Sequence, residues 1–228
     1  MRIIMMGSEY SGTTTLAKGF IEWIKSNLGK TVIFHDHWKI PQISGHPPTE
    51  PPHINLTAEE QIQVSNATSP VKELLMRYAL YYHSPHSYEE TDQFGLYVGY
   101  YFDDLIYGPR YFDYGKPNQP GDRALEKLKI EQTIMKFCPN TVLTLVKCNE
   151  SEIEKRIKSN PHKNQLGNEN DIKFFANRFN EEFETSLITN KITLDTSNSN
   201  VNESVYELIY KLQPFFTKDD RMRLLSGI

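Results

Sequence analysis

Short apolar runs alternate with longer amphipathic stretches along most of this chain. Residues 2–6 form an apolar run that is too brief for a helix, so we expect a buried strand there. A loop rich in Gly, Ser and Thr follows at residues 7–15. The apolar positions of residues 16–28 then recur with helical spacing, and Gly29 is a suitable C-terminal cap. Residues 31–35 are again apolar, which predicts the start of a βαβ unit.

The same alternation continues to the end of the chain. Further strands are expected at residues 94–101, 141–147 and 191–194, with a loop at 107–121. Helices are expected at residues 58–66, 69–82, 122–137, 151–159 and 171–187. A last long helix that carries Val205 and Leu212 is expected after a capping box at Asn200 and Glu203, with a final helical turn after Thr217. Apolar strands that alternate with helices predict an α/β fold, with a parallel sheet covered by helices on both faces.

Two segments depart from this pattern. Residues 36–56 contain five prolines, at positions 41, 47, 48, 51 and 52, which favours an ordered excursion or a lid over regular structure. Residues 160–170 form a polar loop. Neither segment has the composition of a linker, so we expect residues 1–228 to form a single domain.

The composition narrows the class of protein. The chain has 228 residues and a formal net charge of −4, which argues against general nucleic-acid binding. No apolar run approaches the ~18 residues of a membrane span, and the N-terminus is too short for a signal peptide, so a cytoplasmic protein without a membrane partner is expected. Two cysteines, Cys138 and Cys148, exclude a disulfide scaffold.

The first loop carries the clearest chemical motif. Residues 7–14 fit the phosphate-binding pattern G-x-x-x-x-G-K-[ST] at every specified position except one, because Thr13 stands in place of the lysine. Backbone N–H groups and the start of the next helix would bind phosphate, and the Thr14 hydroxyl would bind Mg²⁺. The candidate nucleotide-binding residues are Gly7, Ser8, Glu9, Tyr10, Ser11, Gly12, Thr13, Thr14 and Thr15.

The replaced lysine calls for another cation if the protein is a catalyst, because that ammonium normally neutralises charge on the terminal phosphates. The basic residues after the fourth strand could supply it on closure of a lid. They are Arg156, Lys158, His162 and Lys163, and Arg110 and Lys116 are the rival candidates.

With these residues in place, the chain resembles the P-loop kinases of nucleosides and nucleotides, in the thymidylate kinase and deoxynucleoside kinase group. The resemblance implies a three-layer P-loop NTPase-like fold with a five-stranded parallel sheet in the order 2-3-1-4-5. It also implies a lid at about residues 157–171 and an acceptor site beside the 36–56 segment. The expected acidic-Arg pair after the third strand is absent.

The resemblance also assigns roles to single residues. It implies catalytic roles for Asp36 after the second strand, Asp103 after the third and Arg156 near the lid. It implies nucleotide contacts for Lys163, Asp195 and Thr196.

The function expected on these grounds is phosphoryl transfer from ATP or GTP, with Mg²⁺, to a nucleoside or nucleotide, and a homodimer is left open. One alternative is a sulfotransferase that uses a phosphoadenosine phosphosulfate donor, because residues 11–14 are similar to the Ser-Gly-Thr-Thr loop of those enzymes. The other is a nucleotide-binding protein without activity, which the lost lysine motivates.

Two further groups of rings have ordinary structural interpretations. Thirteen of the 27 aromatic residues fall between positions 78 and 114, where core packing is favoured and one or two rings could stack on a nucleobase. His35 and His37 form only a weak zinc pair, because one intervening residue puts them on the same face of a strand but away from Asp36. A loop position is expected for His46.

Overall fold

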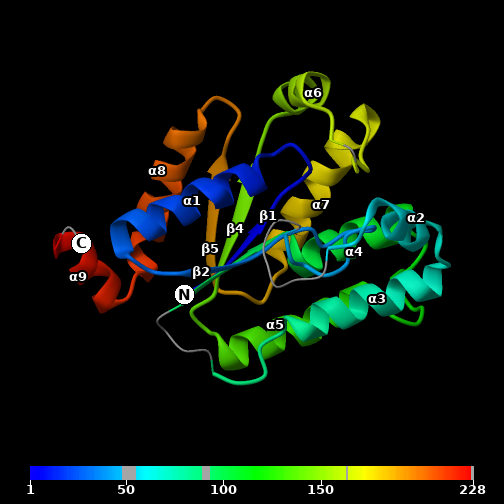
Figure 1. The fold of residues 1–228 in the computed structure, drawn as a ribbon, viewed down its shortest axis with the longest axis horizontal. Coiled ribbons are helices and arrows are strands. Elements are labelled where there is room, and N and C mark those ends of the chain that lie inside the picture. The colour runs from blue at the N-terminus through cyan, green and yellow to red at the C-terminus, as the bar shows by residue number, and fades with distance from the viewer. Residues whose placement is uncertain (48–54, 89–92, 163, 227–228) are drawn as a thin grey trace.

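Five parallel strands form one sheet, in the order β2-β3-β1-β4-β5, in the computed structural model, which describes residues 1–47, 55–88, 93–162 and 164–226 (Figure 1). The strands are β1 (Arg2–Met6), β2 (Val32–His35), β3 (Phe94–Val98), β4 (Val142–Lys147) and β5 (Asn190–Asp195). In the register of the sheet, Ile3 of β1 lies opposite Leu96 of β3 and Val142 of β4. The expected fold class and strand order are confirmed.

Helices connect and cover these strands. They are α1 (Thr13–Leu28), α2 (Ala58–Asn66), α3 (Ser69–Tyr82), α4 (Tyr100–Tyr111), α5 (Arg123–Phe137), α6 (Glu150–Ser159), α7 (Ile172–Glu184), α8 (Val201–Leu212) and α9 (Lys218–Ser226). Single turns of 3-10 helix lie at Glu169–Asp171 and Gln213–Phe215. Within the described ranges, no helix combines the length and the apolar character that crossing a membrane requires.

The sheet separates two hydrophobic cores, because successive side chains of a strand point to opposite faces. Ile3 and Met5 pack with apolar residues of α1 and α8, whereas Ile4 and Met6 pack with residues of α3, α4, α5 and α7. Figure 1 shows these two helical layers on either side of the strands. Every residue of β1 is buried, so the loop that follows it is fixed at the centre of the sheet.

One predicted element is wrong. The strand expected at 94–101 ends at Val98, and α4 takes up the rest of it together with the first part of the loop expected at 107–121. Gly99 lies between β3 and α4 and has a φ of +79°, a backbone conformation that favours glycine. The first residues of α4, Tyr100 and Tyr101, are buried aromatic side chains that continue the apolar run of β3, so the sequence there resembles one longer buried strand.

The C-terminal elements differ less. Helix α7 ends at Glu184 rather than at residue 187, and the expected turn after Thr217 is the nine-residue helix α9. Cys138 is buried and Cys148 is partly buried.

An ion-pair network fixes α4 to α3 and α5. Arg123, whose side chain is 1% exposed, contacts the carboxylates of both Asp104 and Glu73. The Tyr114 hydroxyl lies 2.5 Å from Asp104 Oδ1. Buried charges are tolerated when they are paired in this way, so Asp104 belongs to the core and its neighbour Asp103 is left to face the loop after β1.

Candidate functional site

The loop after β1 leads directly into the N-terminus of α1. Gly12 is the N-cap with φ of +95°, and no side chain caps this helix end or places an acid in its first turn. The first N–H groups of a helix have no partner within it, so they are available to an anion. A Cβ at Gly7 would lie 2.5 Å from the Val146 carbonyl oxygen, so this position requires glycine.

A hydroxyl and a carboxylate meet at this helix end. Thr14 Oγ1 donates a hydrogen bond of 2.9 Å to Oδ2 of Asp36, the residue that follows β2. The other Asp36 oxygen accepts from the His37 backbone N–H at 2.7 Å. Asp36 is buried, with 5% of its surface exposed. Oxygen ligands of this kind are the ones that Mg²⁺ prefers, so Thr14 and Asp36 fit a Mg²⁺ site.

A cavity of about 390 Å³ opens beside the loop. It is bordered by the C-terminal ends of β1, β2 and β3, where open α/β sheets bind their ligands. Its charged side chains, among the described residues, are Glu9, Asp36, Asp103 and Lys39. Burial lowers the pKa of His37, which also lines the cavity, and so favours its neutral form. Among the described residues, three carboxylates and one ammonium therefore border the cavity, and a divalent cation would balance part of this negative charge.

Asp103 faces this cavity from the first turn of α4. Its carboxylate occupies the space beside Gly99, where a Cβ would lie within 2.3 Å of the carboxyl carbon. Burial raises the pKa of Asp103 to about 7, and the nearby Asp36 and Glu9 carboxylates act in the same direction while Lys39 opposes them. A carboxylate with a pKa near 7 is suited to accept a proton at neutral pH.

Within the part of the chain that the structure describes, Lys39 is the lysine that borders the cavity. Its Nζ contacts Oε1 of Glu9 in the loop and lies 5.1 Å from the centre of the Tyr107 ring. The Tyr107 hydroxyl in turn accepts a hydrogen bond from the Glu9 N–H at 3.3 Å. A cation thus lies beside the loop after β1, although it comes from the segment after β2 rather than from position 13.

Two loop side chains contact the segment that was predicted as a lid. The Glu9 carboxylate accepts hydrogen bonds from the N–H groups of Leu166 at 3.1 Å and Gly167 at 2.9 Å. The Tyr10 ring stacks on His162 at 4.4 Å, and its hydroxyl donates to Gln165 at 2.5 Å. The lid segment is therefore packed over the loop.

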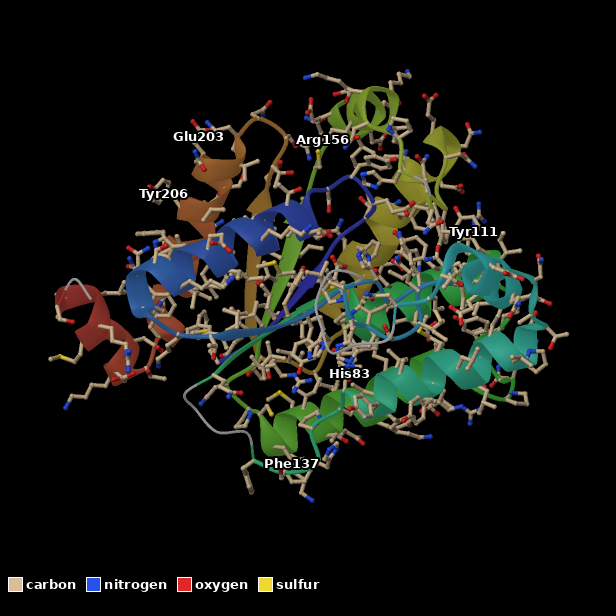
Figure 2. The ribbon with its side chains drawn as sticks, viewed as in Figure 1. His83, Tyr111, Phe137, Arg156, Glu203 and Tyr206 are labelled. Atoms are coloured by element: carbon tan, nitrogen blue, oxygen red, sulfur yellow. The ribbon has the colours of Figure 1, made fainter. Side chains whose placement is uncertain are left out.

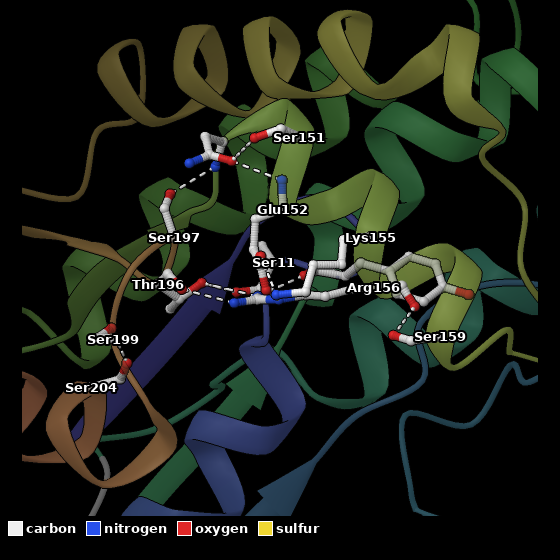
Figure 3. A network of polar contacts seen from close by, with 12 residues as sticks. Ser11, Ser151, Glu152, Lys155, Arg156, Ser159, Thr196, Ser197, Ser199 and Ser204 are labelled. Atoms are coloured by element: carbon white, nitrogen blue, oxygen red, sulfur yellow. Dashed lines mark hydrogen bonds and ion pairs between the residues drawn. The ribbon is translucent and has the colours of Figure 1, made fainter.

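Arg156 lies behind the loop, on α6 (Figure 3). Its guanidinium donates to the Tyr10 carbonyl at 3.0 Å and to the Thr196 carbonyl at 2.7 Å. The Thr196 hydroxyl donates to the Ser11 carbonyl at 2.7 Å. These bonds engage the carbonyl groups of Tyr10 and Ser11, whereas the Ser11 N–H donates to the Ser8 carbonyl within the loop.

A second cavity of about 340 Å³ lies on this side. Its walls include Gly12, Thr15, Arg156 and Thr196 together with the start of α8. Thr15 borders both cavities, so an extended ligand could pass from one to the other along the loop. The flat face of a guanidinium can stack on an aromatic ring, which suits a nucleobase in this second cavity.

The other predicted residues are spread more widely. Asp195 is exposed and accepts from the Ser197 N–H at 2.9 Å. Lys163 lies outside the described residues. Arg110 is paired with Asp171 at 2.6 Å, while Lys116 contacts Asp113. Both rival cations are thus committed elsewhere.

Sequence analysis missed Lys39 and Tyr107 as site residues. Lys39 follows Asp36 by three positions, and its place after the carboxyl end of a strand was the available signal. Tyr107 was hidden because it was assigned to a loop, whereas it lies on α4.

No protein-family model matches the chain, and no curated protein matches it significantly. Among solved structures, its fold is similar to that of deoxyadenosine kinase from M. mycoides with products dCMP and a flexible dCDP bound. The TM-score is 0.57 at 14% identity, over 95% of this chain and 100% of that one.

Two further solved structures are similar. YorR protein from Bacillus subtilis, in complex with phosphorylated GDP, gives a TM-score of 0.53 at 13% identity, over 95% of this chain and 99% of that one. Thymidylate kinase from Candida albicans gives 0.50 at 12% identity, over 96% and 92%. At these identities the comparisons establish the fold, and it is the fold that the sequence resemblance implied.

Proposed function

We propose that this protein is a small-molecule kinase that transfers a phosphoryl group from a nucleoside triphosphate, with Mg²⁺, to a nucleoside or nucleotide. The observation that carries the proposal is the meeting of Thr14 and Asp36 at the open N-terminus of α1, with Asp103 facing the same cavity. Similarity to the fold of kinases for nucleosides and nucleotides supports it.

The donor would bind along the loop. Its base would lie in the cavity bordered by Arg156 and Thr196, and its phosphates would accept from the N–H groups of the loop and of the first turn of α1. Thr14 and Asp36 would hold Mg²⁺, which neutralises charge on the phosphates when it is bound. ATP and GTP both remain candidates for the donor.

The acceptor would bind in the cavity bordered by Asp103 and Lys39. Asp103 would accept the proton of the acceptor hydroxyl as its oxygen attacks the terminal phosphorus, and the nucleoside diphosphate would leave. Lys39 would supply the positive charge that Thr13 cannot, because its four-carbon stem lets the ammonium exchange Glu9 for a phosphate oxygen.

Binding and transfer can be tested separately. We expect ATP–Mg²⁺ or GTP–Mg²⁺ to raise the melting temperature, and a chromatographic assay to detect a phosphorylated product within a panel of nucleosides and nucleoside monophosphates. If phosphoadenosine phosphosulfate alone raised the melting temperature, the result would contradict the kinase proposal and support a sulfotransferase. Nucleotide binding without any product, in wild-type protein that is fully folded, would favour a binding protein without activity.

A further inference from the structure

Three histidines from separate parts of the chain converge at the far side of β2 from the loop. His35 ends β2, His46 lies in the segment after it, and His83 is the C-cap of α3. One ring nitrogen of each lies within 4.8 Å of the others. His35 and His83 are buried and His46 is half-buried. Figure 2 shows His83 on the α3 side of the sheet, well away from Arg156.

The two closest imidazole nitrogens already have the spacing of metal ligands, and the third lies within 4.8 Å of them. His83 Nε2 and His46 Nε2 are 3.2 Å apart, and two nitrogens at Zn²⁺–N distances of about 2.0–2.1 Å in a tetrahedron are about 3.3 Å apart. The ring centres are 4.5, 4.8 and 5.0 Å from one another. Three imidazoles around one such ion have ring centres about 5 Å apart.

The proton positions also suit a metal. His83 Nδ1 lies 2.7 Å from the Ala79 carbonyl oxygen, which can only accept, so Nδ1 carries the proton. The Nε2 atom of the neutral ring then presents its lone pair toward His46. Metal-binding histidines almost always donate their other ring N–H to a carboxylate, a backbone carbonyl or water, and His83 has such a partner in Ala79.

A cavity of about 670 Å³ adjoins the cluster and includes all three histidines in its wall. It gives an ion and a water molecule access, so a three-histidine site could complete its coordination with solvent. The positively charged Arg2 side chain lies near the three histidines. Its guanidinium is 4.0 Å from the centre of the Tyr97 ring and donates to the His83 carbonyl at 2.7 Å.

We propose that His35, His46 and His83 form a Zn²⁺ site that fastens the segment after β2 to α3. That segment carries Asp36 and Lys39, and its return toward β2 is marked by the bond of 2.8 Å from the Asp36 N–H to the Gly45 carbonyl. None of its histidines borders the cavity at the loop, so Zn²⁺ binding can be measured whether or not the protein is a kinase.

The test uses the full-length protein after treatment with a chelator and desalting. Zn²⁺ is titrated by calorimetry, and Co²⁺ is titrated by visible absorption, with excess Mg²⁺ present to occupy oxygen-rich sites such as Thr14 and Asp36. We expect one ion per chain, a tetrahedral Co²⁺ spectrum, and release of protons as the ion displaces them from the imidazoles.

His46→Ala is the main variant, because His46 is half-buried and its loss should not prevent folding. We expect it to weaken Zn²⁺ binding about 100-fold or more and to abolish the tetrahedral spectrum. His86→Ala is the matched control, since His86 is exposed in the wall of the same cavity, and it should leave the affinity unchanged.

Circular dichroism confirms that each variant is folded, and His35→Gln serves as a second variant. Unchanged affinity in His46→Ala and His35→Gln, or the lack of Zn²⁺ binding by folded wild-type protein, would overturn the proposal. The three rings would then be a hydrogen-bonded imidazole cluster.

Discussion

The Thr14 hydroxyl donates a 2.9 Å hydrogen bond to the Asp36 carboxylate, which joins the first turn of α1 to the end of β2. Both groups can bind Mg²⁺ without a change of backbone. We therefore expect Asp36→Asn to weaken binding of ATP about 10- to 100-fold when Mg²⁺ is present. With EDTA present, calorimetry should show wild type and variant binding ATP equally. Thr14→Ser keeps the hydroxyl and is the control, and an equal loss in EDTA would contradict the metal role.

Asp103 should govern the acid side of the pH profile. Its pKa is raised to about 7, and the carboxylate is the form that accepts a proton. We expect kcat/KM for the transfer reaction to fall about tenfold per pH unit below pH 7 and to level off above it. Asp103→Asn should lose about 100-fold or more of kcat and should also lose this dependence. If the pH profile of Asp103→Asn still fell below pH 7, the pH dependence would belong to another group.

The ionised Asp103 carboxylate, which favours activity at high pH, should lower the free energy of unfolding there. Because the pKa of Asp103 is raised from 3.8 to about 7 on folding, the folded state binds a proton more readily than the unfolded state. The wild-type free energy of unfolding should therefore fall relative to Asp103→Asn between about pH 4 and pH 7. Urea titrations at pH 4 and pH 8 should show Asp103→Asn more stable only at pH 8, by roughly 2–4 kcal/mol.

The adjacent Asp104 provides a contrast. Its carboxylate pairs with the buried Arg123, so Asp104→Asn leaves a buried guanidinium less compensated. We expect a loss of roughly 3 kcal/mol in the free energy of unfolding at pH 7, measured by urea denaturation. Asp104→Asn should keep its affinity for ATP–Mg²⁺, whereas a selective loss of affinity in folded protein would place Asp104 in the site.

Gly12 can be tested against a second glycine with the same backbone constraint. Gly12 is the N-cap and Gly29 the C-cap of α1, with φ of +95° and +60°. Valine should destabilise the protein by a similar amount at both ends, about 1–2 kcal/mol. Only Gly12→Val should abolish nucleotide binding, because its side chain enters the space beside Arg156 and Thr196. Unchanged affinity in Gly12→Val, measured by calorimetry, would move the nucleotide away from the loop.

A lysine at position 13 should be able to replace Lys39 as the source of positive charge beside the phosphates. Lys39→Ala should lower kcat about 100-fold or more, with little effect on stability because the side chain is only partly buried. Adding Thr13→Lys to that variant should restore part of the activity. Lys25→Ala, at an exposed position of α1, should change neither kcat nor KM. Failure of Thr13→Lys to restore any activity, with nucleotide affinity kept, would mean that the two positions serve different phosphates.

The sequence predicted the sheet, and it placed a candidate phosphate-binding loop after β1, because both inferences depend on local patterns. The buried run of β1 and the spacing of Gly7 and Gly12 are visible in a few adjacent letters. It named Asp103 but could not exclude its neighbour Asp104, because Tyr100 and Tyr101 at the start of α4 continue the apolar run of β3 and hide where the helix begins. It could not place Lys39 or bring His35, His46 and His83 together, because these contacts arise only when β2, its following segment and α3 pack.

Glu9 connects two parts of the molecule that are far apart in sequence. Its carboxylate contacts Lys39 on one side and the N–H groups of Leu166 and Gly167 on the other. A polyphosphate that attracts the Lys39 ammonium would leave the Glu9 charge to those two amides alone, and so would strengthen them. If the proposed function holds, arrival of the donor and tightening of residues 166–167 above the loop would be coupled through a single side chain, Glu9.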